Sequence, residues 1–533
     1  MTTTILTTDV IGSNLTYTFS TTGDIFVLAA KTRLIADGYS YLYGIVAGIN
    51  VTIDGYVWLQ GDGGGYGSPF YFAGNDSITI GADAEMVLMS SPAGSYGGLM
   101  LGQNGIGGTD FSNYGHITTL VGQGVDIDGG SNTIRNFGSI DVTVGSFTFG
   151  SGGSDTVLNA GTITGRSVNA GGIVTIAGNS NTLTNTGDIL TATFGVNGVL
   201  DQGASGTNII INSGDIRSSG GIGVYSGTGG SVTVVNSGII SGAFGAVVLN
   251  GSGSNLVINT GQLDGGVLFG AGADSYRGIG GTVTGNINGG NGNDTYYLSD
   301  ATQIIVETAT VGSGTDTVYA TVNFRLAANL ERLYLLGFAE TGVGNASGNI
   351  IAGNAGNNRL FGLAGLDNLS GGEGDDVIGG GDGNDTLQGG DGNDWLRGAA
   401  GNDSLTAGGD NDTLIGAIGV DTLRGGTGND QFVFMRQSDS GKTAATSDLI
   451  ADFVRGQDVI DLFGIDARTN NAAPNDTFTF IGAAAFTNVA GQLRYASAAG
   501  VTTVIMDMDG NGTADMTIRL TGTLALTAQD FIL

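Results

Sequence analysis

The sequence predicts an all-β fold: a right-handed parallel β-helix, then a parallel β-roll, then a small C-terminal β domain. Three observations support this prediction. Glycine accounts for 102 of the 533 residues and proline for only 3. A short motif, N-x-G-x-[IL], recurs seven times between residues 109 and 263, and ten nine-residue blocks fill residues 344–433 without remainder. Short strands and glycine turns repeated at a fixed period are the signature of a solenoid.

Composition excludes several classes of protein. The net charge is −31, with only 17 lysines and arginines, so binding to nucleic acid through phosphate neutralisation is not expected. The absence of cysteine removes disulfides and thiolate metal sites. The first nineteen residues contain no basic segment and no long apolar run, so we expect no cleaved signal peptide. No stretch approaches 18 apolar residues, so we expect no membrane span.

Residues 1–108 are predicted to form an N-terminal β cap and the start of the solenoid. Alternating polar and apolar residues indicate short strands. Aromatic residues are frequent here and alternate on predicted strands or lie in the loop 61–75: Tyr39, Tyr41, Tyr43, Tyr56, Trp58, Tyr66, Phe70, Tyr71 and Phe72. They fit either a hydrophobic cap at the solenoid end or a surface that contacts a sugar or another subunit.

Residues 109–263 are predicted to form the β-helix, with one coil for each N-x-G-x-[IL] copy. The copies begin at Asn113, Asn136, Asn159, Asn185, Asn212, Asn236 and Asn259, and their spacing is 23–27 residues. Asparagine tolerates left-handed turns, and its side chains stack into ladders when coils are in register. The residue after the glycine varies from copy to copy, so we expect it to face solvent. Asp188 and Asp215 occupy this position in successive coils, and the single histidine, His116, is interpreted as a surface residue.

Residues 264–343 are predicted to be a connecting β-solenoid with isolated turns of the type G-x-G-x-D. These turns occur in FGAGADSYR, GGNGNDTYY and VGSGTDTVY, and their acids are Asp274, Asp294 and Asp316. Carboxylates in glycine turns are hard oxygen ligands, which suit calcium. The three aspartates are therefore weaker candidate metal ligands, since no partner turn lies eighteen residues away.

Residues 344–433 follow the template G-G-x-G-x-D-x-U-x, in which U is a large apolar residue. The glycines allow positive backbone angles and inward-pointing carbonyls, and the last three residues suit a short strand with its eighth residue in a core. That position holds Ile351, Leu360, Leu369, Ile378, Leu387, Leu396, Leu405, Leu414, Leu423 and Phe432. The sixth position is aspartate in the last eight blocks, but Asn349 and Asn358 replace it in the first two. Asp410 replaces a fourth-position glycine and is expected to strain its turn.

These blocks resemble the RTX family, whose nonapeptides form a calcium-loaded parallel β-roll with two blocks in each coil. The resemblance implies that blocks two apart share calcium through pairs of carboxylates, with about six or more ions. The implied ligands are Asp367, Asp376, Asp385, Asp394, Asp403, Asp412, Asp421 and Asp430, with the turn residues Gly371, Glu373, Gly380, Asp382, Gly389, Asp391 and Gly398. Sites at Asn349 and Asn358 are expected to be weak or empty.

Charge predicts that the array folds only with metal. Residues 344–433 contain twelve Asp and one Glu against three Arg, a net charge of −10. Carboxylates one coil apart (about 5 Å, the strand spacing) repel one another, and glycine turns gain entropy on unfolding. Calcium binding would therefore supply the free energy of folding.

Residues 434–533 resemble the C-terminal domain of the serralysin proteases, through SDLIADFVRGQDVIDLFGIDA, AGQLRY, DMDGNGTADMTIRLTG and the ending DFIL. The resemblance implies an uncleaved type I secretion signal. Within it, Asp507, Asp509, Asn511 and Asp515 have a calcium-loop spacing. The twelfth-position glutamate of an EF-hand is replaced by Ile518, so a polar hairpin turn is the alternative.

The sequence predicts no recognisable enzyme. The protease motif HExxH and the Asp-Pro-His-Glu of mannuronan epimerases are missing, and no nucleophile pairs credibly with the one histidine. Our leading hypothesis is a secreted, calcium-dependent structural protein of a bacterial surface or matrix (an S-layer, sheath or filament subunit) that self-associates into sheets or filaments. The alternatives are an extracellular polysaccharide-acting enzyme using Asp188 and Asp215, or a carbohydrate-binding adhesin, so cell-surface polysaccharide is a possible partner.

Overall fold

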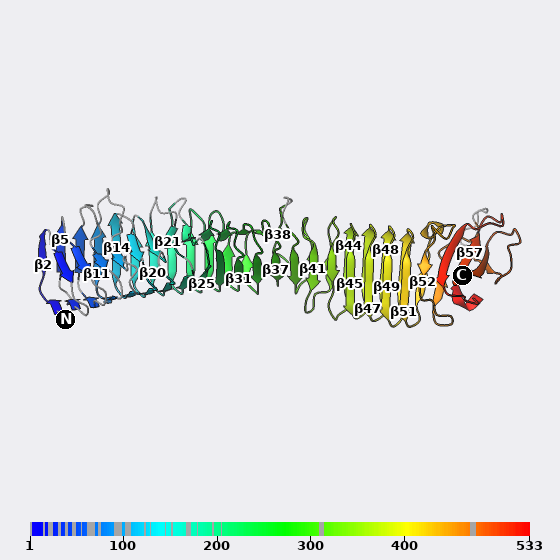
Figure 1. Ribbon diagram of the computed structural model, residues 1–533, viewed down its shortest axis with the longest axis horizontal. Helices are drawn as coiled ribbons and strands as arrows, with labels where there is room; N and C mark the ends of the chain where they lie inside the picture. Colours follow the sequence, from blue (N-terminus) through cyan, green and yellow to red (C-terminus); the bar gives the residue numbers. More distant parts are fainter. Residues whose placement is uncertain are drawn as a thin grey trace. The chain divides into compact units, whose positions relative to one another are not determined.

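The computed structural model is almost entirely β-structure (Figure 1). It divides into two compact units, the first comprising residues 1–296 and 302–314 and the second residues 297–301 and 315–533. The structure describes the chain except residues 1–2, 14–15, 20–24, 30–32, 38–40, 45–49, 55, 61–69, 73–75, 90–98, 102–107, 122–123, 128, 144, 151–152, 167–171, 179, 194–196, 204, 309–313 and 469–475. In the described part, no helix has the length and apolar character needed to cross a membrane.

The first unit is a parallel β-helix whose coils contribute one strand to each of three sheets. Its first sheet contains β1 (Thr3–Leu6), β4 (Ile25–Leu28), β7 (Asn50–Ile53), β10 (Ser77–Ile80), β13 (Asp110–Asn113), β16 (Thr133–Asn136), β19 (Thr156–Asn159), β22 (Thr182–Asn185), β25 (Thr207–Asn212), β28 (Ser231–Asn236), β31 (Leu256–Asn259) and β34 (Ser275–Gly278). The second contains β2 (Val10–Ser13), β5 (Arg33–Asp37), β8 (Tyr56–Gln60), β11 (Glu85–Met89), β14 (His116–Val121), β17 (Ser139–Val142), β20 (Thr162–Gly165), β23 (Asp188–Thr191), β26 (Asp215–Ser218), β29 (Ile239–Gly242), β32 (Gln262–Asp264) and β35 (Thr282–Val283). The third contains β3 (Thr16–Phe19), β6 (Tyr41–Gly44), β9 (Phe70–Phe72), β12 (Leu99–Leu101), β15 (Gly124–Ile127), β18 (Ser146–Phe149), β21 (Gly172–Ile176), β24 (Asn197–Asp201), β27 (Val224–Ser226), β30 (Val247–Leu249), β33 (Val267–Phe269), β36 (Ile287–Asn288) and β38 (Ile305–Val306).

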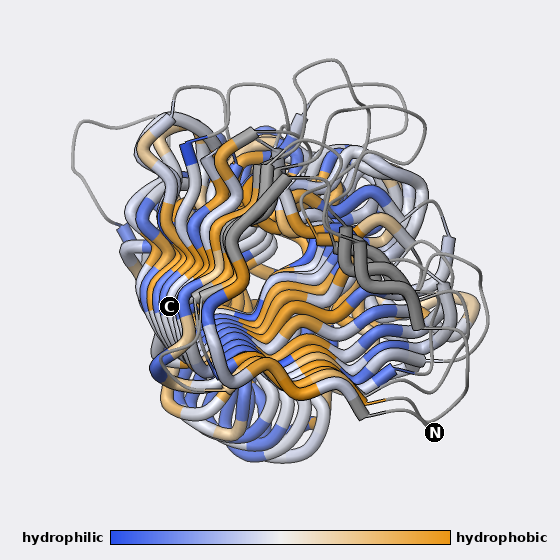
Figure 2. Tube along the Cα trace, turned by 90° about the vertical axis from the view of Figure 1, so that its left-hand side faces the viewer, coloured by the Kyte–Doolittle hydropathy of each residue, from blue (hydrophilic) through white to orange (hydrophobic). Residues whose placement is uncertain are grey.

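Alternation along each strand builds the core of this unit. In the coil β13–β14–β15, Phe111, Ile117 and Val125 come from the three sheets, and all are fully buried. Figure 2 shows apolar and polar residues recurring at the same place from coil to coil. In-register stacking therefore places one apolar row inside and one polar row outside in every sheet.

The asparagine ladder predicted from the N-x-G-x-[IL] motif is confirmed. Each of the seven asparagines is fully buried or nearly so and ends a strand of the first sheet. The first six donate their amide N–H to the Oδ1 of the next copy, and Asn259 donates to the carbonyl oxygen of Thr282. These Nδ2–Oδ1 distances lie between 2.7 and 2.9 Å. The expected left-handed backbone was wrong, because none of the seven is among the described residues with positive φ. Asparagine is used here for its side-chain hydrogen bonds.

The aromatic cluster proposed for residues 1–108 falls largely outside the described part of the chain. Tyr39 and Tyr66 are outside it altogether. The backbone of the others lies in β6, β8 and β9, but their side chains are not described. The choice between a cap and a contact surface therefore stays a prediction.

The second unit contains the nonapeptide blocks, and it coils with two strands per turn instead of three. One sheet holds β39 (Thr317–Ala320), β41 (Arg332–Leu335), β43 (Ile350–Ala352), β45 (Asn368–Glu373), β47 (Thr386–Asp391), β49 (Ser404–Gly409) and β51 (Thr422–Thr427). The other holds β40 (Phe324–Arg325), β42 (Thr341–Val343), β44 (Arg359–Ala364), β46 (Val377–Asp382), β48 (Trp395–Ala400), β50 (Thr413–Ile418) and β52 (Gln431–Val433). A further strand, β37 (Thr295–Leu298), lies at the point in the chain where the two units meet. All ten predicted core residues are at most 1% exposed, so the fold class predicted for this region is confirmed.

Backbone angles explain the second and fourth glycines of the template. Gly372 has φ +124° and Gly374 has φ +102°, values that side-chain-bearing residues rarely adopt. Where the sequence lacks glycine at these positions, the backbone still takes positive φ, as in Ala399 (+89°) and Asp410 (+72°). The strained turn expected at Asp410 is therefore present.

Residues 434–533 continue both sheets of the roll and then change to antiparallel pairing. β53 (Leu449–Ile450) extends one sheet and β54 (Val459–Asp461) the other, and they pair in turn with β58 (Met516–Thr521) and β59 (Phe531–Ile532). β57 (Val501–Asp507) pairs antiparallel with β58 and with β56 (Gln492–Ala498), which adjoins β55 (Thr479–Phe480). Two 3-10 turns, η1 (Gln437–Asp439) and η2 (Ala528–Asp530), complete this part.

Candidate metal centre

The sixth-position aspartates of the roll form a regular stack just before the strands. Each is at most 3% exposed, and its Oδ1 accepts a hydrogen bond from the backbone N–H of the sixth-position residue eighteen positions earlier. In this way Asp367 N–H donates to Asp385, Asp376 to Asp394, and Asp394 to Asp412, over 2.8–2.9 Å. The pairing of blocks two apart is thus present in the structure.

The second oxygen of every one of these carboxylates is buried without a hydrogen-bond partner. This holds for Oδ2 of Asp367, Asp376, Asp385, Asp394, Asp403, Asp412, Asp421 and Asp430. Leaving a buried polar atom unpaired costs about 1–3 kcal/mol, and more when the group is charged. Eight such atoms in one roll are what a site for a positively charged ligand requires.

In seven of the eight aspartate blocks, a glycine at the first position provides room beside this oxygen, and in the eighth block Ala407 stands there. A Cβ added at Gly371 would lie 1.9 Å from Asp376 Oδ2, and one at Gly389 would lie 2.2 Å from Asp394 Oδ2. The same Cβ at Gly389 would lie 2.6 Å from the carbonyl oxygen of Ala407, one coil further on. A carboxylate oxygen and a carbonyl oxygen therefore converge beside Gly389.

Burial raises the pKa of these carboxyl groups. Desolvation is the main cause, and it raises the pKa of Asp376, Asp403 and Asp412 from 3.8 to about 7. Hydrogen bonds from the backbone oppose the shift, and neighbouring aspartates in the stack add to it. A divalent cation would reverse this balance, since a nearby positive charge favours the ionised form. An all-oxygen set of carboxylates and carbonyls fits calcium.

In the two blocks that carry asparagine, the asparagine side chain finds its hydrogen-bond partners within the protein. Asn349 Oδ1 accepts from the N–H of Asn345 at 2.8 Å, and its amide donates to the carbonyl of Leu330 at 3.0 Å. Asn358 makes the equivalent contacts with Asn354 and Ala339. No oxygen is left unpaired there, which supports the expectation that the first two blocks bind calcium weakly or not at all.

The stack continues into the C-terminal domain through two residues that sequence reasoning missed. Asp421 N–H donates to Asp448 Oδ1 at 2.9 Å, and Asp430 N–H donates to Asp458 Oδ1 at 3.1 Å. Asp448 resembles the roll aspartates, because it is fully buried, its Oδ2 has no partner, and desolvation raises its pKa to about 8. The spacings of 27 and 28 residues depart from the eighteen-residue coil, and neither Asp448 nor Asp458 lies in a nonapeptide block, so no template match was available.

The other predicted ligands of the turns lie in different surroundings. Glu373, Asp382 and Asp391 are exposed, and Glu373 and Asp391 lie in register one coil apart. The fifth position, which the template leaves open, forms a surface ladder in which Asn393 N–H donates to Asp375 Oδ1 at 2.8 Å. Among the glycines, Gly371, Gly380, Gly389 and Gly398 all adjoin an aspartate Oδ2.

The isolated turns of residues 264–343 reproduce part of this arrangement. Within the first unit, Asp274 N–H donates to Asp294 Oδ1 at 2.8 Å, and desolvation raises the pKa of Asp274 to about 6 and that of Asp294 to about 7. Asp294 and the buried Glu307 hold carboxylate oxygens within 4.8 Å of each other, and sequence analysis did not single out Glu307. Within the second unit, Asp316 is buried and its N–H donates to Glu331 Oε2 at 2.8 Å.

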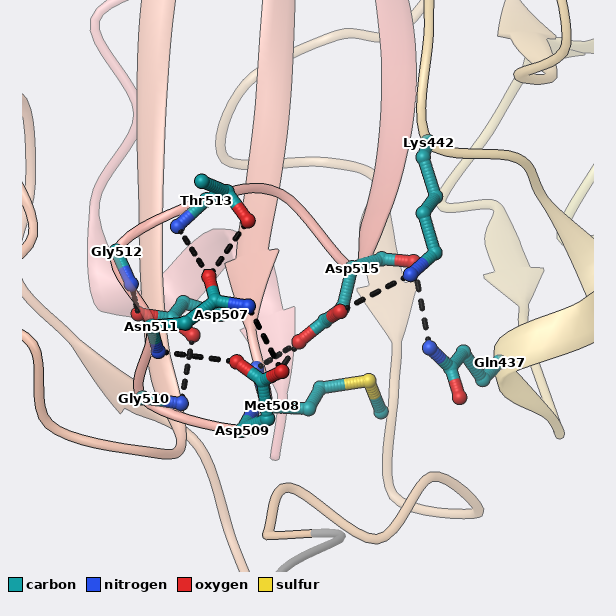
Figure 3. Close-up of polar contacts among 10 residues, drawn as sticks. All are labelled: Gln437, Lys442, Asp507, Met508, Asp509, Gly510, Asn511, Gly512, Thr513 and Asp515. Atoms are coloured by element: carbon teal, nitrogen blue, oxygen red, sulfur yellow. Dashed lines mark hydrogen bonds and ion pairs between the residues drawn. The ribbon is translucent and has the colours of Figure 1, made fainter.

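The predicted loop of Asp507, Asp509, Asn511 and Asp515 connects β57 to β58 (Figure 3). The carboxylate oxygens of the three aspartates gather within 4.8 Å of one another. Each nevertheless accepts hydrogen bonds inside the hairpin, including Gly510 and Gly512 N–H to Asp507. Lys442 Nζ also lies 3.1 Å from Asp515 Oδ1, and hydrogen bonds and this ammonium lower the pKa of Asp515 below its usual range. The gathered carboxylates fit a cation and the hydrogen bonds fit a polar hairpin turn, so both alternatives stay predictions.

The catalytic candidates of the first unit lie on its second sheet. Asp188 and Asp215 are paired in register on β23 and β26, and Asp215 Oδ2 accepts from Arg217 Nε at 3.0 Å. His116 is half-buried and contacts Ser139 through Nδ1 and Thr118 through Nε2. His116 and Ser139 follow the glycine of successive N-x-G-x-[IL] copies, and the structure pairs them in register on β14 and β17.

Comparisons with known proteins assign the C-terminal part of the chain. Residues 288–533 match the family model described as Peptidase M10 serralysin C terminal. A similar solved structure is the solution structure of the AlgE6R3 subunit from the Azotobacter vinelandii mannuronan C5-epimerase, with 21% identity over 35% of this chain and 78% of that chain. Its TM-score is 0.17. No curated protein sequence matches the chain significantly.

Proposed function

With residues 288–533 identified as an RTX-type serralysin C-terminal domain, we propose that the chain is a secreted structural protein of a bacterial surface or matrix that folds on extracellular calcium and then self-associates. The observation that carries the proposal is the row of buried aspartate oxygens without hydrogen-bond partners. Without cations, the buried carboxylates make the folded roll electrostatically unfavourable. Calcium outside the cell supplies them, at the millimolar levels that suit weak extracellular sites (about 10⁻⁴–10⁻³ M).

Asparagine hydrogen bonds between coils support the structural role. They run unbroken through seven coils of the first unit, in addition to the backbone ladders of three sheets. Side-chain ladders of this kind stiffen stacked β-structure. The arrangement suits a subunit that bears load or keeps a fixed spacing, and export before folding would prevent assembly inside the cell.

Electron microscopy of the purified protein tests the proposal. We expect ordered sheets or filaments in millimolar calcium and their loss after a chelator is added, because removal of the cations unfolds the roll. Magnesium at the same concentration is the control for ionic strength, since it fits flexible all-protein oxygen cages poorly. Dispersed single molecules in both calcium and chelator would contradict the assembly role.

A further inference from the structure

We propose that a groove on the outer face of the β-helix binds a segment of acidic polysaccharide, with Arg166 and Arg217 as the groups that recognise its carboxylates. The groove crosses β17, β20, β23, β26 and β29 and has a volume of about 510 Å³. This volume lies in the range of ligand sites, which is about 300–1,000 Å³. The inference goes beyond the calcium-dependent assembly proposed above and does not depend on it.

The floor of the groove is a row of outward side chains in register. Successive strands contribute Asp141, Thr164, Leu190, Arg217 and Ser241, one from each coil. The spacing between neighbours is that of parallel strands, about 4.8 Å. A polymer with a short repeat therefore meets a new side chain at each coil, on a backbone that the sheet holds fixed.

Charge favours an acidic ligand. The chain carries a net charge of −31, whereas the groove is lined by two arginines and one aspartate. Asp215 Oδ2 holds Arg217 Nε at 3.0 Å and thereby orients its guanidinium, whose side chain is 42% exposed. Arg166 is exposed and forms no ion pair with a described residue. Planar guanidinium groups match carboxylates in a two-pronged geometry that a lysine ammonium does not offer.

The remaining lining suits a sugar. Thr164 Oγ1 donates to Asp141 Oδ1 at 3.2 Å, and Ser219 and Ser241 add hydroxyl groups that donate to or accept from sugar hydroxyls. Leu190 lies in the middle of the row and offers an apolar surface to the C–H face of a ring. A few polar groups around an apolar centre are typical of ligand sites. A polyuronate, which is a chain of sugars that carry both carboxylates and hydroxyl groups, matches this lining.

Titration calorimetry of the full chain in calcium tests the proposal. The ligands are short oligouronates, which are too small to gel with calcium, neutral dextran oligomers and sulfated dextran oligomers. We expect oligouronate to bind and the double variant Arg166→Gln, Arg217→Gln to bind at least tenfold more weakly, with neutral dextran bound far less by both. Arg135→Gln is the matched control, because Arg135 lies on the same β-helix and pairs with Asp110 outside the groove. It should bind as the unsubstituted protein does.

A steric variant separates the groove from a general effect of charge. Ala192 is exposed and lines the groove, so Ala192→Trp fills it without changing charge or core packing. This variant should also bind at least tenfold more weakly. Undiminished binding by Ala192→Trp or by the double arginine variant would overturn the proposal, as would equal binding of neutral dextran. Preference for sulfated dextran would overturn the carboxylate assignment. A protein that stays dispersed in calcium but still binds oligouronate would contradict the assembly role and leave the binding groove supported.

Discussion

At the scale of single residues, one side-chain oxygen decides whether the roll needs metal. Asp394 and Asn358 occupy the same place in the template, but only Asp394 has an unpaired buried oxygen. The chain therefore carries both aspartate and asparagine at equivalent positions. The effect of exchanging one for the other on stability is predicted to change sign with calcium.

We expect Asp394→Asn to stabilise the protein in chelator and to destabilise it in calcium. The amide can make the contacts seen at Asn349 and Asn358, which removes the cost of a buried unpaired oxygen (about 1–3 kcal/mol). In calcium the same change removes a ligand, and we expect a loss of similar size. The free energy of unfolding by urea, measured with and without calcium, checks both halves.

Glu340→Gln serves as the control for this variant, because Glu340 belongs to the same unit but is exposed and is not a predicted ligand. It should change the free energy of unfolding little in either condition. Destabilisation by Asp394→Asn in chelator would contradict the account of the unpaired oxygen.

The repeated residues of the site could be predicted from the sequence, whereas residues that join it through contacts between distant segments could not. The eight roll aspartates could be predicted because a nine-residue period places equivalent groups above one another. Asp448 joins the same stack only because residues 434–447 loop out before β53, and no period marks that insertion. The stacking of His116 and Ser139 could be predicted, since both residues follow the glycine of successive N-x-G-x-[IL] copies, but their side-chain contact depends on rotamers that no repeat specifies.

At the scale of elements, the asparagine ladder is a second source of cohesion beside the backbone. Asn185 shows its density of contacts: it accepts from Asn159 and donates to Asn212 at 2.7 Å and to the carbonyl of Gly187 at 2.9 Å. Its position at the end of β22 is closed to water. Removing one such side chain leaves partners on both neighbouring coils unpaired.

We expect Asn185→Ala to destabilise the strands around β22 by about 2–3 kcal/mol, since a lost hydrogen bond in a buried place costs more than its net value. Hydrogen–deuterium exchange of β19, β22 and β25 measures this local change. Thr184→Ala is the control, because Thr184 is the neighbouring residue on the half-buried outer face. Equal exchange in the two variants would show that the ladder contributes no stability.

At the scale of the whole molecule, the raised pKa values predict an unusual dependence of stability on pH. Desolvation holds the pKa of Asp376, Asp403 and Asp412 near 7 in the folded, calcium-free roll, against 3.8 for an ordinary aspartate. The folded state therefore binds more protons than the unfolded state between these values. Stability without calcium must then increase as pH falls through this window and decrease as pH rises.

We expect the calcium-free protein to gain β-structure and a higher Tm when the pH is lowered from above 7 to about 5. With calcium present the trend should reverse, because protons compete with the cation for the same oxygens. Circular dichroism across this range in chelator and in calcium provides the measurement. Stability that rises with pH in chelator would show that the aspartates are not buried in the calcium-free fold.

The junction of the roll with β53 and β54 has a consequence for how subunits can meet. A terminal coil without partners would present unpaired backbone N–H and C=O groups along both sheets, and a neighbouring chain could pair with them. Here the last coil is followed by parallel partners from residues 434–533, and one of the two sheets then turns antiparallel. The last strands of the roll are therefore paired on this side, and the two sheets end instead at β55 and β59. Copies that join without displacing these strands cannot add a strand directly to the roll at this end.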